Sequence, residues 1–260
     1  MRRLLLLVVV VFTACTGGGG DAVFDDTTTS QRPPLASPPN PPDPPTTDGF
    51  SAADRDRLAS STVRVSGVAC GRLSEGSGFA VAEGIIATNA HVVLGVANPT
   101  IDTFDGRRLE GEVVAFDGVL DLALIAVADA DLTPLPLADE APDGTIGAVF
   151  GWEAHPKVDP TPFRVDRPVS VNIVEVAGTE KVRRPSWLLA ADVEAGDSGA
   201  AVIDNDGRVI GVIHSTSLEG TRVGYAVRAE MLTEVIDQGF NTNLIVPPCP
   251  GRTPTTTDAD

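Results

Sequence analysis

The sequence has little positive charge: 19 lysine and arginine residues face 36 aspartate and glutamate residues, a formal net charge of -17 over 260 residues. A nucleic-acid-binding surface needs clustered lysine and arginine, so no nucleic-acid partner is expected. Long hydrophobic runs are missing as well. The one continuous apolar stretch, Leu4–Phe12, is nine residues long, whereas a membrane-spanning helix needs about 20. A multi-span membrane protein is therefore excluded.

Patterns typical of metal sites and of repeat proteins are also lacking. The chain contains three histidines and three cysteines, and nowhere do His, Cys and Asp gather with the spacing of a metal-ligand set. No segment of about 20–50 residues recurs, which argues against a solenoid. We therefore expect no bound metal and no other cofactor.

The N-terminus has the order of a secretory signal segment. Met1-Arg2-Arg3 is positively charged, the apolar run follows, and the small residues Thr13-Ala14 precede Cys15. A cysteine directly after small residues resembles the bacterial lipobox, in which that cysteine is acylated and becomes the new N-terminus. The alternative is an ordinary signal segment with an incidental cysteine. We expect a signal segment over residues 1–15 with lipid on Cys15.

Two segments have almost no apolar residues to bury. Residues 16–50 are rich in Gly, Thr and Pro, and residues 251–260 are similarly poor in core-forming residues. Such chains do not fold alone, and Pro-rich chain is extended and semi-rigid. The sequence thus predicts a disordered tether over 16–50, a folded domain over 51–250 and a disordered tail. We expect an exported protein, lipid-anchored to the outer face of the cytoplasmic membrane; without the lipid it would be secreted or periplasmic.

Short runs rich in Val, Ile and Leu, separated by turns that contain Gly and Asp, fill the region from 62 to 236. The runs within 78–88, joined by Glu83-Gly84, predict a hairpin. Short strands at this regular spacing predict an all-β fold, either barrels or a sandwich. One helix is expected over 228–238, where apolar residues share one face and Gly239 follows as a cap.

Three short motifs carry the chemistry. His91 follows an expected strand, Asp121 opens an apolar one, and Ser198 lies between Gly-Asp and Gly. Each is weak alone, because such residues are often structural. Together they fit one mechanism: a serine hydroxyl needs a base within hydrogen-bond reach, and that imidazole needs a carboxylate to orient it. Glycines around the serine let backbone N–H groups approach a developing oxyanion.

The motifs, in the order His, Asp, Ser, resemble the trypsin/chymotrypsin-like serine proteases. The sequence around His91 is similar to that of the bacterial HtrA-like branch. Longer stretches are similar to the periplasmic domain of actinobacterial acid-resistance serine proteases: 103–111, 121–125 and 190–200. The resemblance covers about residues 60–250 and implies two antiparallel six-stranded β-barrels, which the helix expected over 228–238 would follow. The first barrel would span about 60–135 and the second about 140–240.

The resemblance also implies an activity and a set of roles. The protein would be a serine endopeptidase that hydrolyses peptide bonds through an acyl-enzyme. His91 would be the general base, Asp121 its orienting carboxylate and Ser198 the nucleophile. The N–H groups of Gly196 and Ser198 would form the oxyanion hole. Protein or peptide substrates, a monomeric state and a role in the envelope stress response are expected.

A second aspartate stands near the nucleophile. Asp192 lies six residues before Ser198, where trypsin-like enzymes hold the aspartate that receives Arg or Lys side chains. A buried carboxylate at the base of a pocket would favour a cationic side chain. The alternative is that Asp192 pairs with a local partner.

Two cysteines remain if Cys15 carries lipid. Cys70 and Cys249 lie near the two ends of the expected domain. Outside the cytosol such a pair is a disulfide candidate, although spacing alone does not show that the sulfurs meet. The resemblance supports the pairing, because the actinobacterial relatives join cysteines placed like these.

Two functions of other kinds stay open at this point. One is a catalytically silent binding module with the same fold, and the other is an esterase that uses the same triad on lipids or cell-wall esters. Silent relatives commonly lose a triad member. Here all three members and the flanking glycines are present, which favours an enzyme.

Overall fold

This computed structural model describes residues 42–138, 140–152, 160–216 and 222–249. The predicted signal segment, its Cys15 and the predicted C-terminal tail lie outside the described residues. No helix within these ranges is long and apolar enough to cross a membrane.

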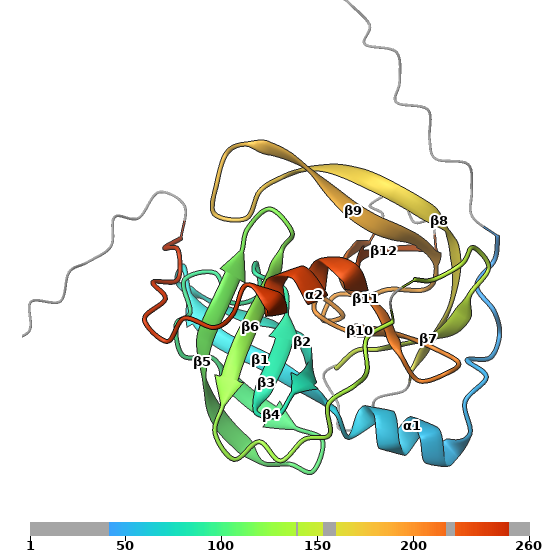
Figure 1. The fold of residues 1–260 in the computed structure, drawn as a ribbon, viewed down its shortest axis with the longest axis horizontal. Coiled ribbons are helices and arrows are strands. Elements are labelled where there is room, and N and C mark those ends of the chain that lie inside the picture. Colours follow the sequence, from blue (N-terminus) through green and yellow to red (C-terminus); the bar gives the residue numbers. More distant parts are fainter. Residues whose placement is uncertain (1–41, 139, 153–159, 217–221, 250–260) are drawn as a thin grey trace, which may run out of the picture. The chain divides into compact units, whose positions relative to one another are not determined.

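Six strands of the first half close into an antiparallel barrel in the order β1-β2-β3-β6-β5-β4 (Figure 1). Closure follows from β1, which pairs with β2 on one side and with β4 on the other. Alternate residues of a strand point to opposite faces, and side chains such as Val63 and Val65 of β1 are fully buried in the barrel core. The strands are β1 (Thr62–Ala69), β2 (Arg72–Ala82), β3 (Ile85–Thr88), β4 (Thr100–Thr103), β5 (Arg108–Asp117) and β6 (Leu122–Val127).

A second closed antiparallel barrel follows in the order β10-β11-β12-β9-β8-β7. It is closed by the pairing of β7 with β10, so that neither barrel leaves an unpaired edge strand. The predicted pair of six-stranded barrels is confirmed, as is the hairpin over 78–88, which β2 and β3 form. The strands are β7 (Ile146–Phe150), β8 (Thr161–Val174), β9 (Lys181–Ala190), β10 (Ala201–Asp204), β11 (Val209–Thr216) and β12 (Val223–Arg228).

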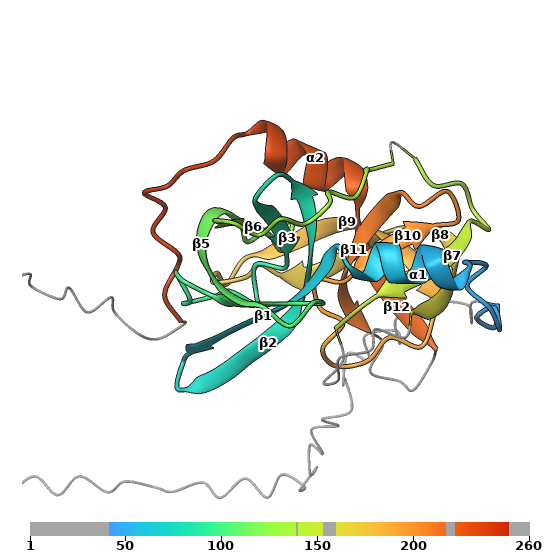
Figure 2. The same ribbon diagram turned by 90° about the horizontal axis from the view of Figure 1, so that it is seen from below.

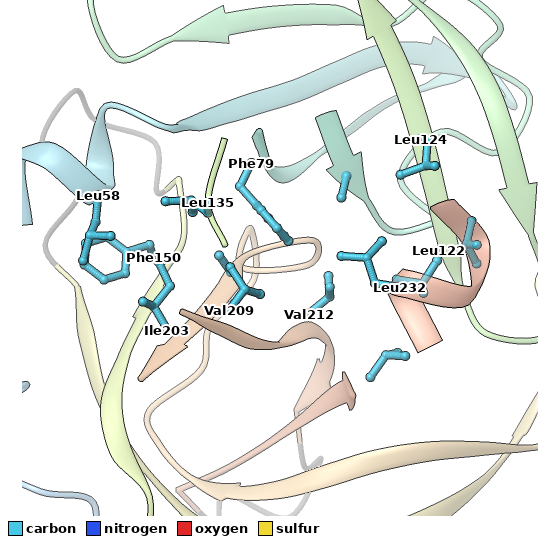
Figure 3. Packing of buried hydrophobic residues seen from close by; sticks show 14 of the residues in the cluster. Leu58, Phe79, Leu122, Leu124, Leu135, Phe150, Ile203, Val209, Val212 and Leu232 are labelled. Carbon is cyan, nitrogen blue, oxygen red and sulfur yellow. The ribbon is translucent and has the colours of Figure 1, made fainter. Parts of the chain in front are cut away.

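The two barrels share a hydrophobic core at their junction (Figure 3). Phe79 and Leu122 come from the first barrel, Val212 comes from the second, and Leu232 comes from the helix α2 (Ala229–Asp237). Helix α2 packs on β11, β12 and β6, and it lies across the junction in both ribbon views (Figures 1 and 2). The predicted C-terminal helix is confirmed. Gly239 follows it with φ +86°, the left-handed conformation typical of a helix end.

The helix α1 (Ala52–Ala59) has no counterpart in the sequence prediction. The signal that could have found it is a serine followed three residues later by an aspartate, a pattern that caps helix N-termini. Ser51 Oγ accepts a hydrogen bond of 3.2 Å from the Asp54 N–H. Leu58 near the end of the helix is fully buried and contributes to the core in Figure 3.

The predicted tether extends too far toward the domain. The ring of Phe50 packs edge-on against Phe150 of β7, with centroids 5.8 Å apart. Asp48 is 3 % exposed, and its carboxylate forms an ion pair of 2.8 Å with Arg55 of α1. Buried aromatic surface and a paired carboxylate hold these residues on the folded unit, so the boundary lies before Asp48 and not at residue 50.

Cys70 and Cys249 form a disulfide, with their Cα atoms 5.7 Å apart across 179 residues of sequence. Cys70 lies in the turn between β1 and β2. The chain that leaves α2 runs along the first barrel: the Asn241 N–H donates to the Val114 carbonyl at 2.9 Å, and the Gly95 N–H donates to the Pro247 carbonyl at 3.1 Å. The disulfide therefore attaches the chain that follows the second barrel to the first barrel.

We expect reduction of this disulfide to lower the thermal midpoint and to slow turnover, because the segment after α2 is released while both barrels remain paired. Closing so long a loop stabilises by up to about 5 kcal/mol on the chain-entropy model. Thermal unfolding and peptide turnover with and without reductant measure the effect. The Cys70→Ser, Cys249→Ser double variant is the control and should not respond to reductant. An unchanged thermal midpoint on reduction would contradict the prediction.

Candidate active site

His91 and Asp121 lie together because β3 and β6 pair. The antiparallel register sets Thr88 opposite Ala123, so that the end of β3 lies beside the beginning of β6. Asp121 directly precedes β6, and His91 follows β3 by three residues. Two motifs 30 residues apart in the sequence are thus brought into contact by strand register.

The Asp121 carboxylate binds the histidine at two points. Its Oδ1 accepts a hydrogen bond of 2.9 Å from the His91 backbone N–H, and its Oδ2 lies 2.9 Å from the imidazole Nδ1. Because an ionised carboxylate only accepts, Nδ1 carries the proton in the neutral imidazole and Nε2 is left as an acceptor. Asp121 is 2 % exposed, whereas the His91 side chain is 38 % exposed, so that the histidine is the accessible member of the pair.

The backbone of Asp121 is held in an unusual conformation. Its φ is +61°, a left-handed value that few non-glycine residues adopt and that surrounding contacts must support. The buried Asn89 supplies such a contact, because its side-chain amide donates to the Asp121 carbonyl at 2.9 Å. Asn89, two residues before His91, therefore supports the backbone conformation of Asp121.

Ser198 lies half-buried in the loop between β9 and β10. The next residue, Gly199, has φ +87°, and a Cβ there would lie 2.1 Å from the Ser77 carbonyl oxygen and 2.6 Å from Thr88 Oγ1. Only glycine fits so close an approach. The serine loop is thereby brought against the end of β3, the strand that leads to His91. No hydrogen bond joins Ser198 Oγ to His91 within the described ranges.

Ser77 of β2 binds the serine loop across the junction of the barrels. Its N–H donates to the Ser198 carbonyl at 2.7 Å, and its Oγ donates to the Gly196 carbonyl at 2.8 Å. The same Oγ accepts a hydrogen bond of 2.7 Å from the Trp152 N–H. In the described part of the chain, the N–H groups of Gly196 and Ser198 donate to no backbone carbonyl. Sequence reasoning used Ser77 only as part of a motif and missed these bonds.

We expect the Ser77→Ala substitution to lower kcat by about 10- to 100-fold, because the Gly196 carbonyl and the Trp152 N–H both lose their partner. Losing one oxyanion-hole donor typically lowers kcat by about 10²- to 10³-fold. Displacing the serine loop while both donors remain should lower kcat by less. Steady-state kinetics on a peptide substrate check this. The matched control is Thr62→Val, which removes another buried hydroxyl bonded to a carbonyl away from the serine loop. Equal kcat for the two variants would contradict the prediction.

The second barrel places Arg184 against Asp121 and His214 against Arg184. Arg184 of β9 is fully buried, with its Nη1 3.4 Å from Asp121 Oδ2. His214 of β11 is 4 % exposed, and its Nδ1 lies 3.3 Å from the same Arg184 Nη1. Sequence reasoning missed Arg184, because one arginine in an alternating strand carries no local signal. Which side chains face Asp121 depends on how the barrels pack.

His214 is held in the neutral state. Burial is the largest cause, and together with the charge of Arg184 it lowers the pKa of His214 to about 3, although Asp121 acts in the opposite direction. Because a guanidinium only donates, Nδ1 of the ring accepts from Arg184. The ring proton is then on Nε2, which lies 3.0 Å from Ser186 Oγ. Arg184 is therefore the permanent cation in contact with Asp121 among these residues.

Asp192 does not lie in a buried pocket. Its side chain is 50 % exposed and forms an ion pair with Arg222, in which Arg222 Nε donates to Oδ1 at 2.7 Å. These hydrogen bonds lower the pKa of the Asp192 carboxyl below its ordinary value. Of the two interpretations of Asp192, the local ion pair is the one that this arrangement fits, because a half-exposed and already paired carboxylate has little attraction left for a substrate cation.

A small pocket of about 180 Å³ opens beside the serine loop. It is lined by Arg64, Glu75, Gly76, Trp152, Ala195 and Gly196. Two larger pockets, of about 520 and 730 Å³, contain none of His91, Asp121 and Ser198. Within the residues that the structure describes, no three His, Cys, Asp or Glu side chains are grouped to hold a metal ion.

Comparison with known sequences identifies relatives over most of the folded unit. The family model of the trypsin-like peptidase domain matches residues 76–212. The serine protease Rv3671c of Mycobacterium tuberculosis is 33% identical over 173 residues, which are 65% of this chain and 43% of that protein. A probable periplasmic serine endoprotease DegP-like of Halomonas elongata is 32% identical over 174 residues, 64% of this chain and 35% of that protein. The chain thus spans less than half the length of these curated relatives.

Solved structures show the same fold. The active form of the Rv3671c protease from M. tuberculosis superposes with a TM-score of 0.73 at 28% identity, covering 83% of this chain and 97% of that one. The HtrA-type protease AlgW with a tripeptide superposes with a TM-score of 0.62 at 22% identity, covering 73% of this chain and 63% of that one. At that identity the second likeness concerns the fold alone.

Proposed function

The chain belongs to the family of trypsin-like peptidase domains, and on that premise we propose that it is an extracytoplasmic serine endopeptidase. His91, Asp121 and Ser198 are its triad. The observation that carries the proposal is the bonded pair of a buried Asp121 and a half-exposed His91, beside a serine loop that Ser77 binds to the same barrel. These are the parts that acyl transfer by a serine requires.

The reaction proceeds in two halves. Ser198 Oγ attacks the substrate carbonyl carbon while its proton passes to His91 Nε2, and Asp121 stabilises the imidazolium that forms. The tetrahedral intermediate then expels the amine, which takes the proton from His91, and an acyl-enzyme remains. Water attacks the acyl-enzyme, gives a proton to His91 and releases the acid as Ser198 recovers its proton. Hydrogen bonds between catalytic groups commonly tighten only when substrate is bound.

The N–H groups of Gly196 and Ser198 form the oxyanion hole. Gly196 has φ +109°, a conformation that glycine adopts readily. The bonds from Ser77 to the Gly196 and Ser198 carbonyls restrain the peptide units around these two donors. Donors fixed before the reaction stabilise the oxyanion without reorganising at the moment of attack.

The substrates are proteins or peptides outside the cytoplasm, and a role in the envelope stress response fits this location. The order of the N-terminal residues supports export, and one similar protein is described as a periplasmic endoprotease. A lipid on Cys15 anchors the domain to the outer face of the cytoplasmic membrane.

We expect Cys15→Ala to release the protein from the membrane fraction, because the apolar run before it is too short to span a bilayer. Fractionation, together with the mass of the N-terminal peptide, measures anchoring and lipid. The Cys70→Ser, Cys249→Ser variant serves as control and should stay with the membrane. A Cys15→Ala protein that remains in the membrane fraction, or a wild-type peptide without lipid mass, would refute lipid anchoring.

Active-site labelling followed by a substrate survey tests the proposed activity. A fluorophosphonate probe should label the wild-type protein at Ser198, and a peptide-library digest should show cleavage of internal peptide bonds. Absence of labelling would favour a silent binding module. Labelling with hydrolysis of lipid or cell-wall esters, but of no peptide, would favour an esterase.

A further inference from the structure

A buried arginine from the second barrel contacts the turn that carries Asp121. The β8–β9 hairpin reaches toward the turn between β5 and β6 (Figure 1), and the Val176 N–H at its tip donates to the Gly118 carbonyl at 2.9 Å. Further along β9, Arg184 Nε donates to the Val119 carbonyl at 3.0 Å. Both contacts lie within three residues of Asp121, so that the hairpin braces the backbone of this turn.

The guanidinium of Arg184 is held by a chain of polar contacts. Its Nη1 lies 3.4 Å from Asp121 Oδ2 and 3.3 Å from His214 Nδ1. Ser186 Oγ lies 3.0 Å from His214 Nε2 and 3.3 Å from the Arg184 carbonyl, to which it donates. This series of polar contacts thus ends at the backbone carbonyl of Arg184, and it fixes both the His214 ring and the Arg184 guanidinium. Within the described ranges, Arg184 Nη2 has no hydrogen-bond partner.

Hydrophobic packing alone gives no reason for the charged guanidinium of Arg184 in this buried position. Burial lowers the pKa of the Arg184 guanidinium, while the charges of Asp121 and of Asp117 in β5 act in the opposite direction. Removing an arginine from water is costly unless an opposite charge compensates. Of those two carboxylates, Asp121 is the one that Arg184 touches.

We propose that Arg184 is a positioning residue of the triad, which holds the Asp121 carboxylate from the second barrel and balances its charge. The proposal rests on the proposed function, because it takes His91 as the general base. Asp121 is faced by His91 from the segment after β3, by Arg184 from β9 and by the neutral His214 from β11. With the guanidinium present, part of the Asp121 charge is balanced, so that the carboxylate attracts the imidazolium less strongly.

The first test is the pH profile of kcat/KM for Arg184→Met and Arg184→Lys on a peptide substrate. Arg184→Met should lower kcat/KM by about 10- to 100-fold and move the midpoint of the acid limb upward by about 0.5–1 pH unit. Arg184→Lys should return that midpoint toward the wild-type value because it keeps the charge. The matched control is Arg183→Met, which removes the exposed neighbouring charge on β9 and should leave the profile unchanged. A slower Arg184→Met enzyme with an unmoved acid limb would overturn the proposal.

The second test needs no activity. Free energies of unfolding are measured for Arg184→Met, Asp121→Asn and the double variant in a double-mutant cycle. We expect the double variant to be more stable than the sum of the single changes predicts, because it leaves no buried charge unpaired. Should Arg184→Met fail to fold, recovery of folding in the double variant supports the same conclusion. Additive effects, or a double variant that does not fold either, would overturn it. Failure of wild-type labelling refutes the peptidase function, whereas the cycle still reports whether Arg184 holds Asp121.

Discussion

The Ser198→Ala protein should fold like the wild type and lose both fluorophosphonate labelling and peptide cleavage, with kcat reduced by about 10⁴- to 10⁶-fold. The fold should persist because the bonds that hold the loop are made by backbone groups: the Ser198 carbonyl accepts from Ser77, and the Gly199 N–H donates to the Ile213 carbonyl at 2.8 Å. The side chain removed is small and half-buried. The rate should fall because the proposed nucleophile is removed.

Active-site labelling, single-turnover kinetics and the thermal midpoint measure these three expectations separately. Ser170→Ala is the matched control, since it removes an exposed serine on β8 far along the chain from the histidine motif. It should keep wild-type labelling and turnover. Peptide cleavage at the wild-type rate by Ser198→Ala would refute the serine mechanism. If the variant lost both cleavage and its fold, unfolding would explain the loss of activity.

The Asp121→Asn protein should lose about 10⁴-fold in kcat, in line with the effect of this change on serine triads. An asparagine oxygen can still accept from the His91 backbone N–H. Its amide, however, donates to Nδ1, so that the imidazole proton moves to Nε2, where the base must be free to accept. The substitution thus leaves the histidine in place but in the wrong tautomer.

Kinetics on a peptide substrate, with labelling rates as a second readout, check the effect of Asp121→Asn. The control is Asp48→Asn, which changes another buried, arginine-paired carboxylate away from the site. It should lower the free energy of unfolding while kcat stays at the wild-type value. An Asp121→Asn enzyme within about tenfold of wild type would show that His91 does not depend on this carboxylate.

Several features of the site could be expected from sequence because they depend on local signals. The strands follow from alternating apolar residues with Gly and Asp at the turns, and the two strands of the 78–88 hairpin form where that pattern predicts them. The His, Asp and Ser motifs can each be recognised from the residues next to them in the sequence. Strand register then brings His91 and Asp121 into hydrogen-bond contact. Cysteine counting makes Cys70 and Cys249 a candidate pair and the resemblance supports it, but closure of a loop over 179 residues has no local signature in the sequence.

Other features needed the folded chain. Asp192 could be either a pocket base or a local partner, and only the position of Arg222 and the exposure of the carboxylate distinguish these. The sequence pattern predicts a tether up to residue 50 and no helix where α1 forms, because this segment is stabilised by the contact of Phe50 with Phe150 and by the burial of Leu58. Neither contact is visible in a composition that is rich in proline and polar residues.

By itself, the sequence determined an all-β domain with its turns, its C-terminal helix α2 and three motifs of serine-hydrolase type. These depend on backbone preference and on the alternation of buried and exposed residues along one strand. Only the tertiary structure decided that Ser77 binds the serine loop and that Arg184 lies against Asp121. Such contacts join residues more than 60 positions apart, and they are set by the closure of the barrels and by their packing against each other, which no stretch of neighbouring residues encodes.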